Sequence, residues 1–246
     1  MVMVPAFNAG PTIAELLEKI SKIVNRKDII VIDDGSLDRT LEVSQSAGVE
    51  VLKHERNKGK GEALKTGFKY ALEKNYDHVI TIDADLQHDP ESIPDFIHKI
   101  ENTYPLHLGE KDKVRGKQAE SIKLSCVHPP LESIIIGTRE RNLKNMPFAR
   151  WLINNLSSVI VSVLSGQSIR DSQSGYRLIS TQVLKNVRLE SKNYDLEPEL
   201  LIKASRKGFK IDEVPIRTIY TGGKSFINPF VDTGRFIKLM WRSLWW

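Results

Sequence analysis

Cysteine is almost absent from this sequence, since Cys126 is the only one in 246 residues. A single cysteine cannot form an internal disulfide, so the fold does not depend on an oxidising compartment, and a cysteine zinc site is excluded. The six histidines include no HExxH or HxxxH pair, which argues against a zinc enzyme.

Long apolar runs are also missing. The nearest to one, Trp151 to Leu164, is interrupted by two asparagines and three serines, so we expect no segment that spans a membrane. No basic segment precedes the apolar stretch at Val2–Val4, so we expect no signal peptide. The prediction is a cytoplasmic protein that can still lie on the surface of a membrane.

Two common nucleotide-binding patterns are absent. The turn Gly59-Lys60-Gly61 has Leu64 where GxGxxG needs a small residue, and the chain has no GxxxxGK[ST]. These absences argue against nicotinamide dehydrogenases and P-loop NTPases. The net charge of +5 suggests an anionic partner, although scattered surface lysines explain it equally well.

The order of the apolar segments predicts an α/β fold. Strands are expected at 2–4, 28–32, 49–53 and 78–82, with helices at 10–24, 38–47, 60–72 and 90–100 between and after them. Thr12 and Glu15 are spaced as a capping box for the first helix. Such alternation is typical of βαβ units and a mostly parallel sheet.

The second half of the chain is less regular. Residues 104–130 lack periodicity and are predicted to be a flexible insertion. A strand at 134–139, a helix at 147–164, a strand at 177–179, a helix from 194 to 208, an extended stretch at 209–220 and a helix at 228–246 follow. We interpret residues 1–246 as one domain, with a first half at 1–103 and a second at 131–227.

Two predicted strands end in paired carboxylates. Asp33 and Asp34 follow one strand, and Asp83 and Asp85 follow another. In a parallel sheet both pairs lie at the edge where α/β proteins bind ligands, and Asp83 with Asp85 could hold a hard divalent cation. Each pair has a plainer interpretation as a solvated or capping turn. An EF-hand is excluded, because His88 stands at its glycine position and Pro94 at its glutamate position.

Taken together, six motifs resemble family 2 glycosyltransferases, and the dolichyl-phosphate mannose synthase branch in particular. In order, the motifs are Pro5-Ala6-Phe7-Asn8, Val31-Ile32-Asp33-Asp34-Gly35-Ser36, Asn57-Lys58-Gly59-Lys60-Gly61, Asp83-Ala84-Asp85-Leu86-Gln87, Gly137-Thr138-Arg139 and Ser174-Gly175-Tyr176-Arg177. The resemblance implies a GT-A fold, a nucleotide-sugar donor, Mg²⁺ or Mn²⁺, and inversion at the anomeric carbon. It does not distinguish a GDP-sugar from a UDP-sugar.

The resemblance also implies roles for residues. Donor-binding candidates are Pro5, Phe7, Asn8, Asp33, Asp34, Lys60, Asp83, Ala84, Asp85, Gln87 and Lys224, with Asp83, Asp85 and Gln87 at the metal. Acceptor-binding candidates are Arg139, Arg150, Asn154, Asp171, Ser174 and Arg177. Two departures from the family pattern are Ala9, where Glu is usual, and Asn154, where the branch usually has Ser.

The acceptor remains open between two chemistries. A polyprenyl phosphate is already ionised near neutral pH and needs positioning by cations, a role that suits Arg139 and Arg150. A sugar or protein hydroxyl needs a general base, which Asp195, Glu197 or Glu199 could supply, although acidic residues there also stabilise a helix amino terminus. A third hypothesis is a nucleotide-sugar-binding protein without catalysis.

The last predicted helix, at 228–246, is basic and rich in tryptophan. Arg235, Lys238 and Arg242 share one face, and Phe230, Ile237, Trp241 and Leu244 share another. Such a helix is typical of peripheral contact with a membrane, and the alternative is docking on the core or on another copy. We expect no nucleic-acid partner and leave open whether a separate membrane protein anchors the chain.

Overall fold

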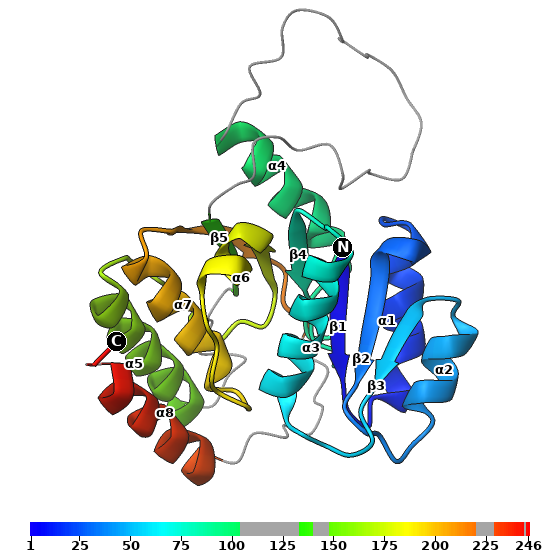
Figure 1. Ribbon diagram of the computed structural model, residues 1–246, viewed down its shortest axis with the longest axis horizontal. Helices are drawn as coiled ribbons and strands as arrows, with labels where there is room; N and C mark the ends of the chain where they lie inside the picture. The colour runs from blue at the N-terminus through cyan, green and yellow to red at the C-terminus, as the bar shows by residue number, and fades with distance from the viewer. Residues whose placement is uncertain (104–132, 140–147, 220–228, 244) are drawn as a thin grey trace, which may run out of the picture.

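The computed structural model describes residues 1–103, 133–139, 148–219, 229–243 and 245–246, with only the backbone described at 102–103, 148–153 and 229–233. The predicted insertion at 104–130 therefore lies outside the described residues. The described chain is an α/β structure built on one sheet with helices on both faces (Figure 1). The prediction of this fold class is confirmed.

Seven strands form the sheet in the order β3-β2-β1-β4-β6-β5-β7. Their bounds are β1 Val2–Ala6, β2 Ile29–Asp33, β3 Glu50–Lys53, β4 His78–Thr81, β5 Ser133–Arg139, β6 Arg177–Ser180 and β7 Lys210–Ile216. All neighbouring pairs are parallel except those of β6, which runs antiparallel to both β4 and β5. Because β6 runs the other way, its first residue, Arg177, lies at the edge where β4 and β5 end.

The helices follow the strands as the sequence predicts. Their bounds are α1 Gly10–Ser21, α2 Thr40–Ser46, α3 Lys60–Glu73, α4 Ile93–Thr103, α5 Phe148–Ser165, α6 Thr181–Asn186, α7 Leu196–Arg206 and α8 Pro229–Ser243, with short 3₁₀ turns at Arg26–Asp28 and Pro90–Ser92. One apolar cluster packs α3, α6 and α7 on one face of the sheet, and another packs α1 and α4 on the opposite face. None of the helices in these ranges is long and apolar enough to cross a membrane.

The strand residues alternate between the two clusters. Met1 and Met3 join the α3 side, whereas Val2 and Val4 join the α1 side, as the two-residue period of a strand requires. Helix α3 comes very close to β1 at Gly67, where an added Cβ would lie 1.8 Å from the sulfur of Met3. A side chain at position 67 would therefore push α3 away from the sheet.

The first helix begins differently from the prediction. Its N-cap is Ala9, and no side chain caps it, so the predicted capping box of Thr12 and Glu15 is wrong. The N–H groups of Asn8, Ala9 and Gly10 instead donate to Ser36 Oγ, Thr40 Oγ1 and Asp38 Oδ2. Side chains from the loop after β2 therefore do the work that a local cap would do.

Candidate active site

The carboxyl edge of the sheet brings the predicted carboxylates into one region. Asp33 ends β2, and Asp83 and Asp85 lie in the turn that follows β4, with β1 between the two strands. The amino ends of α3 and α7 reach the same region, because Lys60 and Glu197 contact each other there. This is the place where α/β sheets bind ligands.

Lys60 forms the link between the two halves of the sheet. Its Nζ lies 2.7 Å from Asp83 Oδ1 and 2.9 Å from Glu197 Oε1, and 5.5 Å from the ring centre of Tyr194. Burial alone would lower the pKa of the Lys60 ammonium, but the two carboxylates outweigh it and raise that pKa above its ordinary value. Lys60 therefore stays charged and neutralises Asp83.

The carboxyl groups of Asp83 and Asp85, in the turn after β4, differ in their acidity. Burial opposes ionisation of Asp83, but the charges of Lys60, His88 and Arg139 more than offset it, and the pKa of Asp83 falls below its usual range. For Asp85, partial desolvation and then the negative charge of Asp83 raise the pKa above the usual range. Two carboxylates that repel each other are suited to binding a hard divalent cation, which removes the repulsion.

The residues of the turn offer a partial ligand set. In the described ranges, no group of three or more His, Cys, Asp or Glu side chains could hold a metal by itself. Asp83 and Asp85 therefore fit a metal that takes its remaining ligands from water and a bound diphosphate, as Mg²⁺ commonly does. Gln87 is half-buried, and its backbone N–H donates to Asp85 Oδ1 at 3.0 Å.

Other elements hold this turn in place. Thr12 in α1 donates its hydroxyl to the carbonyl of Ala84 at 2.6 Å, and the N–H of Ile219 donates to the carbonyl of Gln87 at 3.0 Å. Gly175 packs directly on Asp83, since an added Cβ would lie 2.3 Å from Asp83 Oδ2. Thr81 fixes that approach by donating to the carbonyl of Gly175 at 2.7 Å.

The predicted nucleoside-binding residues Asp33 and Asp34 contact the loops that surround them. Asp34 is buried, and its carboxylate accepts hydrogen bonds from the N–H groups of Lys58 and Gly59 and contacts His54 Nδ1 at 2.6 Å. Asp33 Oδ1 accepts from the N–H of Ser36, while Asp33 Oδ2 is buried with no hydrogen-bond partner in the described part of the chain. Asp34 therefore shapes the turn before α3.

The remaining residues of the first loop lie beside this turn. Pro5 is buried within β1, and Phe7 and Asn8 are half-buried at its end. Asn8 has a positive φ of 51°, and its Oδ1 accepts from the N–H of Leu37. The loops after β1 and β2 thus form one cross-linked unit, and their contacts with a nucleotide stay a prediction.

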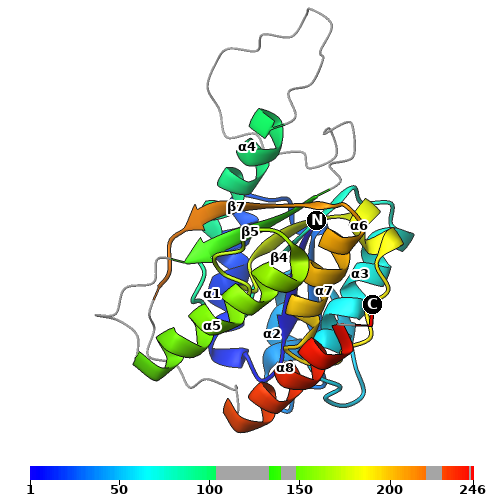
Figure 2. The ribbon, with the colours of Figure 1, turned by 90° about the vertical axis from the view of Figure 1, so that its left-hand side faces the viewer.

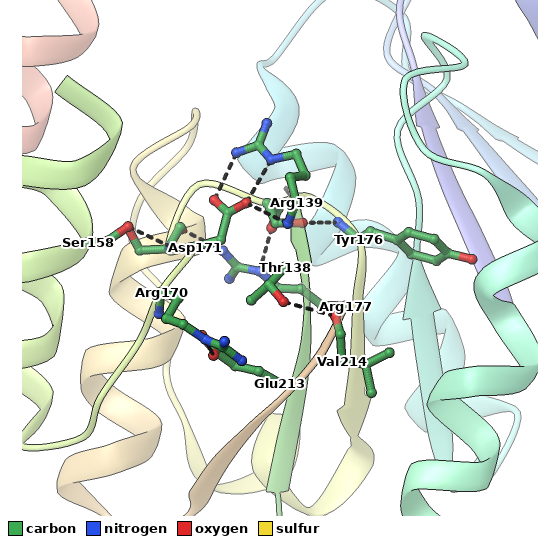
Figure 3. A network of polar contacts seen from close by, with 11 residues as sticks. Thr138, Arg139, Ser158, Arg170, Asp171, Tyr176, Arg177, Glu213 and Val214 are labelled. Carbon is green, nitrogen blue, oxygen red and sulfur yellow. Dashed lines mark hydrogen bonds and ion pairs between the residues drawn. The ribbon is translucent and has the colours of Figure 1, made fainter. Parts of the chain in front are cut away.

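Arg139 is the cation at the end of β5, and Asp171 holds it in a two-pronged ion pair (Figure 3). The Nε and an Nη of Arg139 donate to the two oxygens of Asp171 at 2.7 and 2.8 Å. Asp171 is buried, so the pair is rigid, and it raises the pKa of the Arg139 guanidinium despite burial. Arg139 therefore presents a fixed positive charge near Asp83.

Arg177 is fully buried and bonded to the backbone. Its three nitrogens donate to the carbonyls of Ser172, Ser174 and Glu197 at 2.7 to 2.8 Å. Burial lowers the pKa of this guanidinium below its ordinary value. These contacts make Arg177 a support for the loop that carries Ser174 and Gly175, and its predicted contact with an acceptor stays a prediction.

Two of the three candidate general bases, Glu197 and Glu199, are committed to charged partners. Glu199 is fully buried and accepts from Lys203 and from the N–H groups of Glu190 and Ser191, which lowers the pKa of its carboxyl even though burial opposes this. Glu197 is buried against Lys60. The third, Asp195, is half-buried, and its Oδ1 accepts from the N–H of Asn193 at 3.2 Å. The contacts of Glu197 and Glu199 do not favour a hydroxyl acceptor.

Helix α5 forms a wall beside Asp171. Ser157 and Ser158 on its inner face contact Ser172 Oγ, and Ser157 also accepts from Gln173 Nε2 at 2.7 Å. Asn154 is half-buried on the same helix. The side chain of Arg150 and all of Lys224 lie outside the described residues, so their roles stay predictions.

The sequence prediction missed two residues of this region. His54 follows β3 directly, so the rule that found Asp33 and Asp83 would also have found His54. Thr12 was assigned to a helix cap, although its hydroxyl reaches Ala84 from 72 residues away in sequence. No local pattern indicates that contact.

Three comparisons with known proteins agree with this geometry. The family model for glycosyl transferase family 2 matches residues 1–159. A UDP-N-acetylglucosamine–dolichyl-phosphate N-acetylglucosaminyltransferase of Methanococcus voltae is 32% identical over 239 residues, covering 89% of this chain and 85% of that protein. An undecaprenyl-phosphate mannosyltransferase of Micrococcus luteus is 26% identical, covering 88% and 82%.

Among solved structures, the glucosyl-3-phosphoglycerate synthase of Mycobacterium tuberculosis bound to UDP has the same fold. The TM-score is 0.70 at 19% identity, covering 98% of this chain and 78% of that one. The same enzyme has also been solved with Mn²⁺ and UDP, at a TM-score of 0.65 and 21% identity.

Proposed function

Because this chain belongs to glycosyl transferase family 2, we propose that it transfers a sugar, with inversion, from a nucleotide-sugar donor to a polyprenyl or dolichyl phosphate in a metal-dependent reaction. The observation that carries the proposal is the meeting of opposite charges at one edge of the sheet. Asp83 and Asp85 lie there with Lys60, and the charge of Arg139 acts on Asp83 from the other half. This arrangement suits two phosphate-bearing substrates and a divalent cation.

On the donor side, the chain must stabilise the negative charge of the departing nucleoside diphosphate. Held by Asp83 and Asp85, Mg²⁺ or Mn²⁺ would supply most of that stabilisation. Lys60 is a charged, half-shielded ammonium within 3 Å of Asp83 and adds positive charge at the same place. Thr12 and Gly175 keep the turn from shifting when the charge develops.

On the acceptor side, a polyprenyl phosphate brings its own ionised nucleophile and needs orientation. Arg139 can bind phosphate oxygens while Asp171 keeps the guanidinium aimed. Glu197 and Glu199 are already paired with lysine side chains, which supports a phosphate acceptor over a hydroxyl acceptor. Two relatives whose names specify dolichyl phosphate and undecaprenyl phosphate support the same acceptor class.

The decisive experiment incubates the purified chain with a panel of GDP- and UDP-sugars, a polyprenyl phosphate and Mn²⁺. We expect one donor to yield a product that partitions into organic solvent, and EDTA to abolish it. Polyprenol without phosphate and a free saccharide are the matched controls and should accept no sugar. Transfer to the saccharide alone, or full transfer in EDTA, would contradict the proposal.

A lipid acceptor would place the reaction at a membrane surface, in keeping with the expected peripheral location on the cytoplasmic face. Cell fractionation with and without carbonate washing tests that location. Release by carbonate is expected for a peripheral protein. Retention only in the presence of a second membrane protein would indicate a separate anchor.

A further inference from the structure

Helices α5 and α8 carry large apolar side chains that are exposed in the described part of the chain. Leu156, Val159 and Val163 on α5, and Ile237, Trp241 and Trp245 on or just after α8, are each 58% to 82% exposed. They are six of the eight exposed large hydrophobic residues in the described ranges. Helical spacing puts Leu156, Val159 and Val163 on one side of α5, and Ile237 and Trp241 on one side of α8, which Trp245 follows after its end. We call the six together the α5–α8 face.

The inner sides of both helices are docked on the protein. Leu239 and Ser243 of α8 are buried, and Arg242 forms an ion pair with Glu190. The ring of Trp246 lies 4.3 Å from the ammonium of Lys203 in α7. The described residues therefore account for the inner side of α8, and within these ranges the apolar side chains on its outer side are exposed.

Arg206 in α7 joins the ends of α5 and α8. Its guanidinium donates to the carbonyl of Leu164 at the end of α5 and to the carbonyls of Ser243 and Trp246 at the end of α8. The two helices lie side by side in both views (Figures 1 and 2). Since their carboxyl ends meet, Val163 and Trp241 come from corresponding ends of the two helices.

The charge around the α5–α8 face favours an anionic membrane as its occupant. Residues 148–165 contain no Asp or Glu, and residues 229–243 contain Arg235, Lys238 and Arg242 against a single Asp232, although Arg242 is already paired with Glu190. Lys207 and Lys210 are exposed just beyond α7. Exposed tryptophans and aliphatic side chains flanked by lysine and arginine match the boundary of an anionic bilayer.

Helix α5 also connects this face with the candidate acceptor site. Its outer side carries Val159 and Val163, while Ser157 and Ser158 on its inner side contact Ser172, next to the Asp171 that holds Arg139. One helix diameter, about 10 Å, therefore separates the exposed stripe from that loop. Helix α5 is therefore the part of the α5–α8 face that contacts the loop holding Arg139.

We propose that the outer sides of α5 and α8 together form the surface with which this protein lies on an anionic phospholipid membrane. The C-terminal helix is then only half of the contact, and α5 supplies the half nearest the acceptor. The inference rests on the proposed function for the identity of the acceptor. Its membrane contact is independent of that function.

The test is flotation of the full chain with vesicles of phosphatidylcholine and phosphatidylglycerol at 3:1. Because a charged side chain at a bilayer boundary strongly opposes burial, V159E/V163E and W241E/W245E should each lower the partition coefficient at least about tenfold. The control L37E, in the loop after β2, should change it less than about twofold, although Leu37 is 92% exposed. Unchanged binding of V159E/V163E would overturn the role of α5.

A second measurement needs no variant. Vesicles with brominated acyl chains should quench the tryptophan fluorescence of the wild-type chain, and unbrominated vesicles should not. Absence of quenching would overturn the proposal. So would a wild-type dimer in sedimentation that V159E/V163E converts to a monomer, because the face would then be covered by a second copy.

A water-soluble short-chain polyprenyl phosphate separates this inference from the proposed reaction. If both stand, V159E/V163E keeps transfer to the short acceptor and loses transfer to a long acceptor in vesicles. Wild-type transfer to the short acceptor without vesicle binding would overturn the membrane surface alone. Vesicle binding without transfer to either acceptor would overturn the proposed reaction alone and leave the membrane contact supported.

Discussion

Asp34 in the first half of the sheet and Arg177 in the second are both buried charges at the carboxyl edge, but opposite partners hold them. Asp34 accepts from two backbone N–H groups and contacts His54, whereas Arg177 donates to three backbone carbonyls. The first half, residues 1–103, thus uses carboxylates to shape its loops, and the second half, residues 133–219, uses an arginine.

The two halves also differ in what remains accessible. In the first half, the carboxylate of Asp85 is exposed to solvent. In the second half, the buried carboxylate of Asp171 holds the guanidinium of Arg139 in place. Lys60 joins them by pairing with Asp83 and Glu197 at once. The charged residues at the carboxyl edge of the sheet therefore fall into two groups: those that hold the loops of the site in place, and those that face the site.

The largest effect is expected for Asp85→Ala, which removes a group that faces the site. Because Asp85 is exposed, the variant should keep its melting temperature while kcat falls by about 10³-fold or more. Steady-state transfer assays at saturating Mn²⁺, with differential scanning fluorimetry, check both parts. Full activity of this variant in EDTA would remove the metal from the mechanism.

Arg177→Met tests a residue that builds the site. It leaves the carbonyls of Ser172, Ser174 and Glu197 buried without donors, and we expect a loss of about 3 to 5 kcal/mol in the free energy of unfolding. Urea unfolding measures it. The control is Arg170→Met, which breaks an exposed ion pair with Glu213 and should cost about 1 kcal/mol or less. Equal losses would refute the distinction.

Acid should weaken the first half selectively, because every histidine in the described ranges lies there. Burial lowers the pKa of His78 to about 4, below the ordinary 6.5. Between pH 6.5 and 4, His78 is therefore protonated in the unfolded chain but not in the folded chain. The free energy of unfolding falls as the pH drops through this range. The full loss is about 3 kcal/mol. In His78→Gln the loss of unfolding free energy between pH 6.5 and pH 4, measured by urea unfolding, should be smaller by about that amount.

Arg139→Lys should act on one substrate only. Lysine keeps the charge but loses the two-pronged geometry with Asp171, so the KM for the lipid phosphate should rise by about tenfold. The KM for the nucleotide sugar should change little. A matched rise in both constants would mean that Arg139 serves the donor as well.

The smallest effect is expected for Thr12→Val, which deletes the hydroxyl that bonds Ala84. A single hydrogen bond is worth about 1 kcal/mol, so the dissociation constant for Mn²⁺ in the presence of nucleoside diphosphate should rise by about fivefold. Isothermal titration calorimetry measures the change. Thr66→Val, which loses a contact with His54 in the first half, is the control and should leave it unaltered.

Sequence reasoning could locate the strands and their terminal carboxylates, because apolar runs that end in Asp33 and Asp83 are local patterns. It could not assign the direction of β6, since the short stretch Arg177–Ser180 pairs only with strands distant in sequence. It also could not foresee the burial of the Arg177 guanidinium among carbonyls, because that burial depends on the loop at 172–174 and the start of α7 at Glu197 closing around it. Long-range contacts decide such roles.

The residue at position 175 limits where the Asp83 carboxylate can lie in any variant or relative of this chain. Its missing side chain leaves the space that the Asp83 carboxylate occupies, although the two residues are 92 positions apart. A chain of this fold with a larger residue at position 175 must hold Asp83 elsewhere. One residue in the second half therefore indicates whether the turn after β4 in the first half can take this form, and sequence alone is enough to read it.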